Sequence, residues 1–133
     1  MSLFIKERFK MHSGKWSDFK LECDGLTEQD YMTLAFLVSR KMRFCNVYGI
    51  PRGGVLFANC LNPYAVSDTK DFLIVDDVLT SGGSLLKARD ELSQKHGDTY
   101  TYKGIVVFAR GECLPWVTPI FTLNSLFYQA DEH

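Results

Sequence analysis

The spacing of apolar residues along the chain predicts three helices. After Thr27, apolar side chains recur every three or four residues, and Asp30 stands three residues beyond Thr27 as in a capping box. This pattern predicts a helix from Glu28 to about Arg43. A short apolar segment predicts a second helix over Val55–Leu61, and helical spacing predicts a third over Ser84–His96.

Apolar runs between these helices predict strands. The continuous run Phe72–Val75 is typical of a strand in a parallel sheet whose two faces are both covered by helices. Further strands are expected at Asn46–Ile50, Gly104–Ala109 and Pro119–Leu123, and alternation over Trp16–Cys23 predicts a half-buried one. This order of elements predicts an α/β fold with a doubly wound parallel sheet, in which loops after successive strands converge on one ligand site.

Composition narrows the class of protein. The 133 residues contain neither a repeat nor a Pro/Ser-rich linker, so one domain spanning residues 1–133 is expected. Fifteen basic and sixteen acidic residues give a net charge of −1, which argues against a nucleic-acid partner. Met1–Lys10 lacks an uninterrupted apolar stretch, so we expect neither a signal peptide nor a membrane anchor, and a cytoplasmic location. The four cysteines lack the spacing of a zinc site.

The segment after the central strand carries the clearest chemistry. Two carboxylates, Asp76 and Asp77, precede a group of hydroxyl and glycine residues that opens directly into the third helix. Backbone amides at a helix start favour an anion, and glycines let the backbone approach it closely. Adjacent carboxylates need polyol hydroxyls or a cation as partners. A ribose 5-phosphate satisfies both requirements, whereas an acidic turn followed by a Ser/Gly helix cap is the alternative without a ligand.

This segment resembles the 5-phosphoribosyl 1-pyrophosphate signature of type I phosphoribosyltransferases. The likeness extends from Phe72 to Ser84, with Ser81 in place of the more usual second threonine. It implies that Asp76 and Asp77 contact the ribose hydroxyls. It assigns the 5-phosphate to the loop residues Leu79, Thr80, Ser81, Gly82, Gly83 and Ser84, and it makes Val78 a further substrate-binding residue.

Three other segments extend the resemblance. Pro51, Arg52 and Gly53 follow the strand before, and they look like the family's pyrophosphate loop. Residues 9–19 are similar to the hood strand of the orotate branch, within a small N-terminal hood expected at about residues 9–23, but His12 replaces the usual lysine. Arg110 matches an arginine that this branch places near the pyrimidine, although Ala109 replaces the preceding acid.

The resemblance implies a glycosyltransferase of nucleotide metabolism that moves phosphoribose from 5-phosphoribosyl 1-pyrophosphate, hereafter the donor, to a pyrimidine-like base, with orotate as the leading candidate. Mg²⁺ is the implied cofactor, held mainly through ligand oxygens and water. The partners expected are therefore small molecules. A sensor without turnover and a purine-base transferase are the alternatives.

One part of the family pattern is absent from the sequence. Type I transferases insert a long hairpin with a mobile basic loop before the ribose-phosphate strand, whereas only Asn62–Asp71 are available here. The positive charge of the missing loop would have to come from Arg52, from Lys70, or from a neighbouring subunit in a homodimer. We therefore expect slow turnover or none.

Overall fold

The computed structural model describes residues 26–79, 82–110 and 113–123. Three helices are present in these ranges: α2 (Glu28–Lys41), α3 (Val55–Leu61) and α4 (Gly83–His96). Short 3-10 helices follow two of them, η1 (Asn62–Tyr64) and η2 (Gly97–Thr99). The strands are β1 (Asn46–Gly49), β2 (Asp71–Leu79), β3 (Thr101–Arg110) and β4 (Val117–Leu123). The predicted hood and its strand lie outside the described residues.

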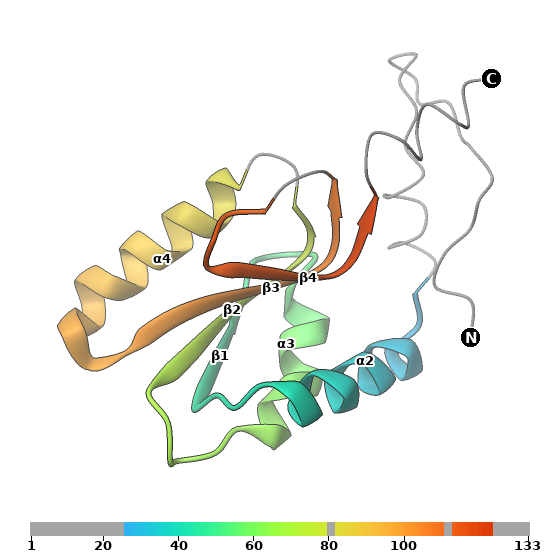
Figure 1. Ribbon diagram of the computed structural model, residues 1–133, viewed down its shortest axis with the longest axis horizontal. Coiled ribbons are helices and arrows are strands. Elements are labelled where there is room, and N and C mark those ends of the chain that lie inside the picture. Colours follow the sequence, from blue (N-terminus) through green and yellow to red (C-terminus); the bar gives the residue numbers. More distant parts are fainter. Residues whose placement is uncertain (1–25, 80–81, 111–112, 124–133) are drawn as a thin grey trace.

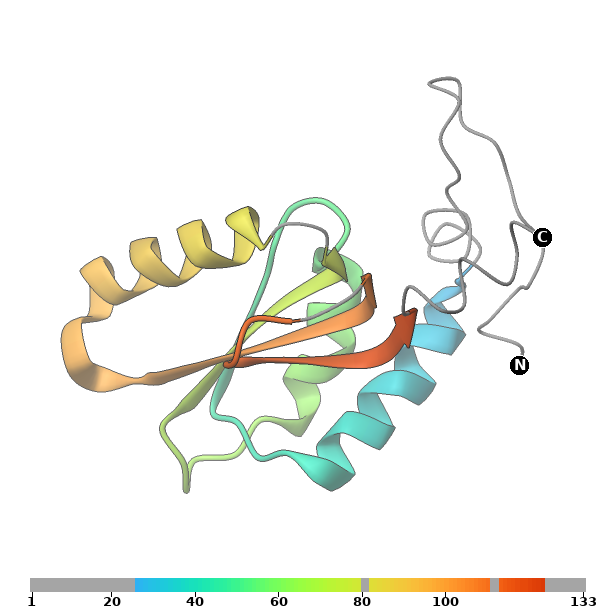
Figure 2. The same ribbon diagram turned by 45° about the horizontal axis from the view of Figure 1, so that its top comes forward.

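The four strands form one parallel sheet in the order β1-β2-β3-β4. Helices α2 and α3 cover one face of this sheet and α4 covers the other (Figures 1 and 2). The expected α/β class with a parallel sheet between helices is therefore confirmed. The carboxyl ends of all four strands lie at one edge of the sheet, because parallel strands share a direction.

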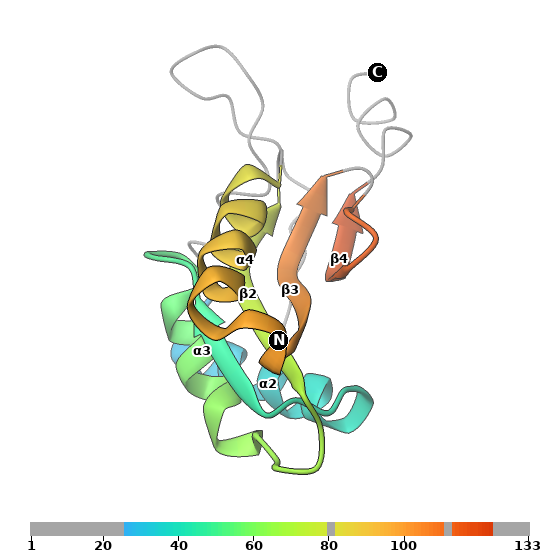
Figure 3. The same ribbon diagram turned by 90° about the vertical axis from the view of Figure 1, so that its left-hand side faces the viewer.

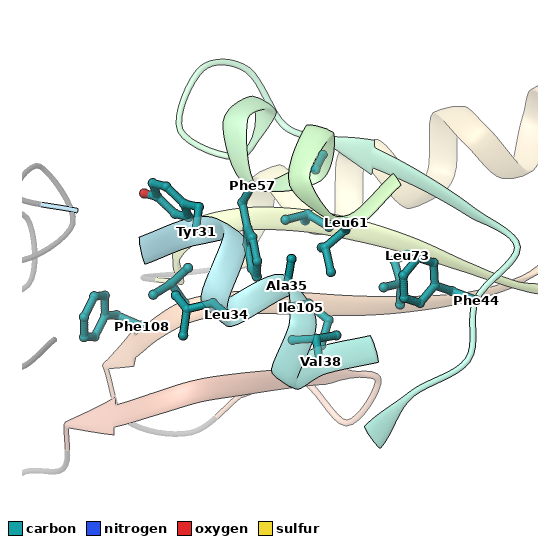
Figure 4. Close-up of a cluster of buried hydrophobic side chains, with 13 residues drawn as sticks. Tyr31, Leu34, Ala35, Val38, Phe44, Phe57, Leu61, Leu73, Ile105 and Phe108 are labelled. Atoms are coloured by element: carbon teal, nitrogen blue, oxygen red, sulfur yellow. The ribbon is translucent and has the colours of Figure 1, made fainter. Parts of the chain in front are cut away.

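Strand β2 lies between two hydrophobic clusters because its successive side chains point to opposite faces. Leu73 and Val75 pack with α2 and α3, in a cluster that includes Leu34 and Phe57 (Figure 4). The intervening Ile74 packs with α4 on the other face. All three β2 side chains are fully buried, which explains why this segment of the sequence is a continuous apolar run.

The two helical crossovers of the sheet have opposite hands. Both connections step in the same direction across the sheet, yet α3 and α4 lie on opposite faces. In Figure 3, α4 lies in front of β2 with β3 to the right, so the β2-α4-β3 crossover is right-handed. The β1-α3-β2 crossover is consequently left-handed, which is rare among parallel strands.

Helices α2 and α4 begin and end close to the positions that the sequence predicts. The Thr27 hydroxyl accepts from the Asp30 amide at 3.1 Å, and the Asp30 carboxylate accepts from the Thr27 amide at 3.0 Å, which completes the capping box. Helix α4 begins after Gly82, whose φ is 82°, and ends at Gly97, whose φ is 61°. Glycine adopts such positive φ values without steric cost.

The strands extend further than the apolar pattern predicts. Strand β2 continues through Asp76 and Asp77 to Leu79, and β3 begins at Thr101 rather than Gly104. In both extensions, polar residues join the ladder because the partner strand runs alongside them: Asp71 pairs with Thr101, and Asp76 with Val106. The two carboxylates therefore stand on the last part of a strand, which holds them more firmly than a loop would.

Candidate functional site

Asp76 and Asp77 stand near the carboxyl end of β2, and both are half-buried. The Asp77 amide donates to Asp76 Oδ1 at 2.8 Å, and the Val78 amide donates to Asp77 Oδ1 at the same distance. Because neighbouring strand residues point to opposite faces, the two carboxylates lie in different surroundings. Asp76 lines a cavity at the start of α4, whereas Asp77 faces the loop that precedes α3.

The cavity beside Asp76 is built from the end of β2 and the first turn of α4. It has a volume of about 40 Å³. Its walls are formed by Asp76, Val78, Leu79, Gly82, Gly83, Ser84 and Leu85. Gly83 and Ser84 are the first residues of α4, so the cavity lies at the positive end of the helix dipole. These features suit a phosphate group.

The loop after β1 lies directly against the end of β2. The Ile50 amide donates to the Val75 carbonyl at 2.8 Å, and the Pro51–Arg52 peptide bond is cis. A methyl group added at Gly53 would collide with the Asp77 carboxylate, and one added at Gly54 would collide with the Val75 carbonyl. Only glycine at these two positions permits so close an approach. The R-G-G turn and the acidic pair, separate in the sequence, are thus in contact.

The third predicted segment reaches the same edge of the sheet. Arg110 is the exposed last residue of β3, one position beyond Ala109, which pairs with Leu79. Leu114, which follows the β3 end, approaches Gly82 so closely that a methyl group there would lie 2.9 Å from Leu114 Cδ1. The structure therefore brings Arg110 to the edge that carries the acidic pair. His12, Thr80 and Ser81 lie outside the described residues.

The electrostatics of the acidic pair are unusual. Burial of the Asp76 carboxyl raises its pKa to about 7, and the adjacent Asp77 contributes a further increase through its side chain and its charge. The hydrogen bond from the Asp77 amide acts in the opposite direction and lowers this pKa. The raised value means that the folded protein holds Asp76 in an environment that disfavours its charged form. Donated hydrogen bonds from a ligand would favour that charged form.

Replacing Asp76 by asparagine should stabilise the protein at high pH. The folded state binds more protons than the unfolded chain between the ordinary carboxyl pKa of 3.8 and the folded pKa of about 7, so wild-type stability falls as pH rises through this window. Asparagine accepts the same amide hydrogen bond without a charge. We expect the melting temperature of Asp76→Asn to exceed that of wild type at pH 8 and to approach it below pH 4. A constant difference across this range would contradict the assignment.

A cation at this site would rely mainly on oxygens that the ligand supplies. Among residues 26–79, 82–110 and 113–123, no group of three or more His, Cys, Asp or Glu side chains could hold a metal ion. Asp76 and Asp77 offer carboxylate oxygens, the donor type that Mg²⁺ prefers. The acidic pair therefore fits a cation shared with a polyol phosphate.

In the described part of the chain, no helix is long and apolar enough to span a membrane.

Comparisons with known proteins agree with this geometry at the level of the fold. No protein-family model and no curated protein matches the sequence. The crystal structure of orotate phosphoribosyltransferase from Aeropyrum pernix is similar, with a TM-score of 0.62 and 20% identity over 92% of this chain and 89% of that one. The Mycobacterium tuberculosis H37Rv orotate phosphoribosyltransferase in complex with Fe(III) dicitrate gives a TM-score of 0.59 and 16% identity over 93% and 88%. The chain has the phosphoribosyltransferase fold.

Lys70, which the sequence suggested as a source of positive charge, lies far from the site. Lys70 directly precedes β2, and its carbonyl accepts from the Thr101 amide at 2.9 Å at the amino end of the sheet. Asp76 lies six positions further along the chain, a span of roughly 20 Å in a strand. Lys70 therefore cannot supply charge to the site. Sequence reasoning instead missed Lys87, one turn into α4, because a lysine at an exposed helical position carries no distinctive signal.

Proposed function

We propose that this protein binds 5-phosphoribosyl 1-pyrophosphate and transfers its phosphoribose to a pyrimidine-like base, with orotate as the leading candidate. The observation that carries the proposal is the contact between Gly53 and the Asp77 carboxylate. It joins a loop suited to pyrophosphate with carboxylates suited to ribose hydroxyls. The cavity at the start of α4, which suits the 5-phosphate, borders Asp76.

Each part of the donor has a group that suits it. Asp76 and Asp77 accept hydrogen bonds from the ribose hydroxyls, and the amides at the start of α4 bind the 5-phosphate. The backbone of the Pro51–Gly54 loop binds pyrophosphate, while the exposed Arg52 adds positive charge as the bond to the anomeric carbon breaks. Mg²⁺, when bound, neutralises part of the charge that develops on the departing pyrophosphate. The protein's own contribution is chiefly positioning.

Arg110 and the structural neighbours support the choice of a pyrimidine-like base. Arg110 stands at the rim of the site, where its guanidinium suits a carboxylate or carbonyl of a pyrimidine. Two structural neighbours with the same fold are orotate phosphoribosyltransferases. His12 remains a prediction for the hood side of the base.

A non-catalytic sensor is the second candidate, and the connection before β2 favours it. Between the end of η1 at Tyr64 and the start of β2 at Asp71 there are only six residues, 65–70, so no hairpin is inserted there. The basic loop that would cover the reacting centre is therefore not built from this segment. Binding without efficient turnover follows if no other residue takes over its work.

Transfer activity should be measured with the labelled donor, Mg²⁺ and a panel of pyrimidine and purine bases. We expect donor binding, and pyrophosphate release with orotate that is well below the ordinary enzyme range of about 10 per second. Asp77→Asn serves as the control for release that depends on the site. Binding without release under any base would favour the sensor, whereas absence of donor binding would refute both candidates.

A further inference from the structure

A second cavity lies beside β1 on the face of the sheet that carries α4. It has a volume of about 230 Å³. Its lining consists of Tyr48, Ile50, Pro51, Ser84, Lys87, Ala88 and Glu91. We call it the β1 groove. It combines an apolar floor from the strand with polar groups from the helix.

The β1 groove exists because β1 has no covering neighbour in the part of the chain that the structure describes. There, β1 pairs only with β2, and α4 packs on β2 and β3 rather than over β1. The short connection over residues 65–70 adds no further strand. Tyr48 consequently keeps 37% of its surface exposed although it belongs to the sheet.

The groove is continuous with the proposed donor site. Ser84 lines both the groove and the cavity assigned to the 5-phosphate. Pro51, which also lines the groove, belongs to the loop assigned to pyrophosphate. A ligand that extends from Asp77 past the Pro51–Gly54 loop therefore meets the mouth of this groove.

Lys87 is the basic residue of the groove, and Glu91 is its acidic counterpart one turn further along α4. Both are exposed, and neither takes part in an ion pair among the described residues. Lys87 lies four residues after Gly83, about 6 Å along the helix axis. Its flexible four-carbon stem can return the ammonium group toward the helix start.

Arg89 and Lys103 are engaged elsewhere, and Arg110 is assigned to the base. Arg89 lies over the Trp116 ring, with its guanidinium carbon 4.6 Å from the ring centre. Lys103 pairs with Asp71 at 2.8 Å at the amino end of the strands. Arg52 is the cation of the pyrophosphate loop itself, and a diphosphate carries more negative charge than one guanidinium balances.

We propose that Lys87 binds the terminal phosphate of the donor's pyrophosphate group, and so supplies charge that a mobile loop provides in the family the sequence resembles. This inference rests on the proposed function, because the donor must lie across Asp77 and the Pro51–Gly54 loop. The ammonium group of Lys87 can reach the ligand through the groove between β1 and α4. Glu91 opposes the approach of an anion from the far end of the groove.

Lys87→Ala should weaken binding of the donor and of inorganic pyrophosphate about tenfold, as expected for loss of a hydrogen bond to a charged group. Binding of ribose 5-phosphate should change less than about twofold, since that ligand lacks the terminal phosphates. Titration calorimetry with each of the three ligands and Mg²⁺ gives all the affinities needed. Lys95→Ala, an exposed lysine in the last turn of α4, is the matched control. Glu91→Gln should leave donor affinity equal or higher.

Three results would each overturn the assignment of Lys87. The first is a donor affinity of Lys87→Ala equal to that of Lys95→Ala. The second is an equal loss for ribose 5-phosphate and the donor, which would place Lys87 on the 5-phosphate. The third is weaker donor binding in Glu91→Gln. In all three, wild type still binds the donor, so the proposed function stands. A wild-type protein that binds neither the donor nor ribose 5-phosphate would instead remove the proposed function and this inference together.

Discussion

Asp77→Asn is expected to weaken donor binding by about 1 to 3 kcal/mol, or roughly 5- to 150-fold, because a hydrogen bond to a charged acceptor is lost. The carboxylate stands at the end of β2 against the loop that suits pyrophosphate, where it can accept from a ribose hydroxyl. Asparagine preserves the shape and the acceptor oxygen for the Val78 amide, which lies 2.8 Å away. Folding stability should therefore change much less than affinity.

Calorimetric titration with the donor and Mg²⁺, together with thermal unfolding of the free protein, separates the two effects. Asp90→Asn provides the control, since Asp90 is an exposed carboxylate on α4 away from the cavity lining. Equal donor affinity in Asp77→Asn, Asp90→Asn and wild type would show that Asp77 is not a ligand for the sugar.

Gly53→Ala should abolish most donor binding. The added methyl group would occupy the space of the Asp77 carboxylate, so either the loop or the carboxylate must move. A displacement of about 1 Å in a positioned group can cost 100-fold in function, and we expect a loss of that order. The measurement is donor affinity, with circular dichroism to establish that the sheet is retained.

Gly97→Ala separates this effect from a general loss of stability. Gly97 has a φ of 61°, but an added methyl group would meet no atom within 4 Å. The substitution should lower stability by about 1 to 3 kcal/mol through its backbone conformation alone and leave donor affinity intact. If Gly53→Ala binds the donor as well as Gly97→Ala does, the contact between the two motifs has no role in binding.

Local patterns account for the parts of the fold that the sequence predicted. The capping box at Thr27 and Asp30, the helix stop at Gly97 and the buried core of β2 each depend on neighbours a few residues apart. The strand-to-helix context of the acidic pair is also local. The cavity that the structure shows beside Asp76 and Gly83 lies in this segment, and its binding of phosphate stays a prediction.

Features that depend on distant partners could not be predicted in this way. Strand β2 extends through Asp76 because β3 runs alongside it, a pairing that apolar periodicity does not encode. The same holds for the contact between Gly53 and Asp77 and for the left-handed crossover. Lys70 and Lys87 look equivalent in the sequence, and only the direction of the strands shows that one is far from the site.

Among residues 26–79, 82–110 and 113–123, β1 pairs only with β2, and its open edge bears on aggregation of the protein. An unpaired strand edge is a template for pairing with other chains and hence for aggregation. Here that template is only four residues long, Asn46–Gly49, and the Asn46 side chain accepts the Val47 amide at 2.9 Å. Both features limit the backbone groups that an incoming strand could pair with. Lengthening β1 or removing the Asn46 amide group would therefore make the protein more prone to aggregate, even though neither change alters the site.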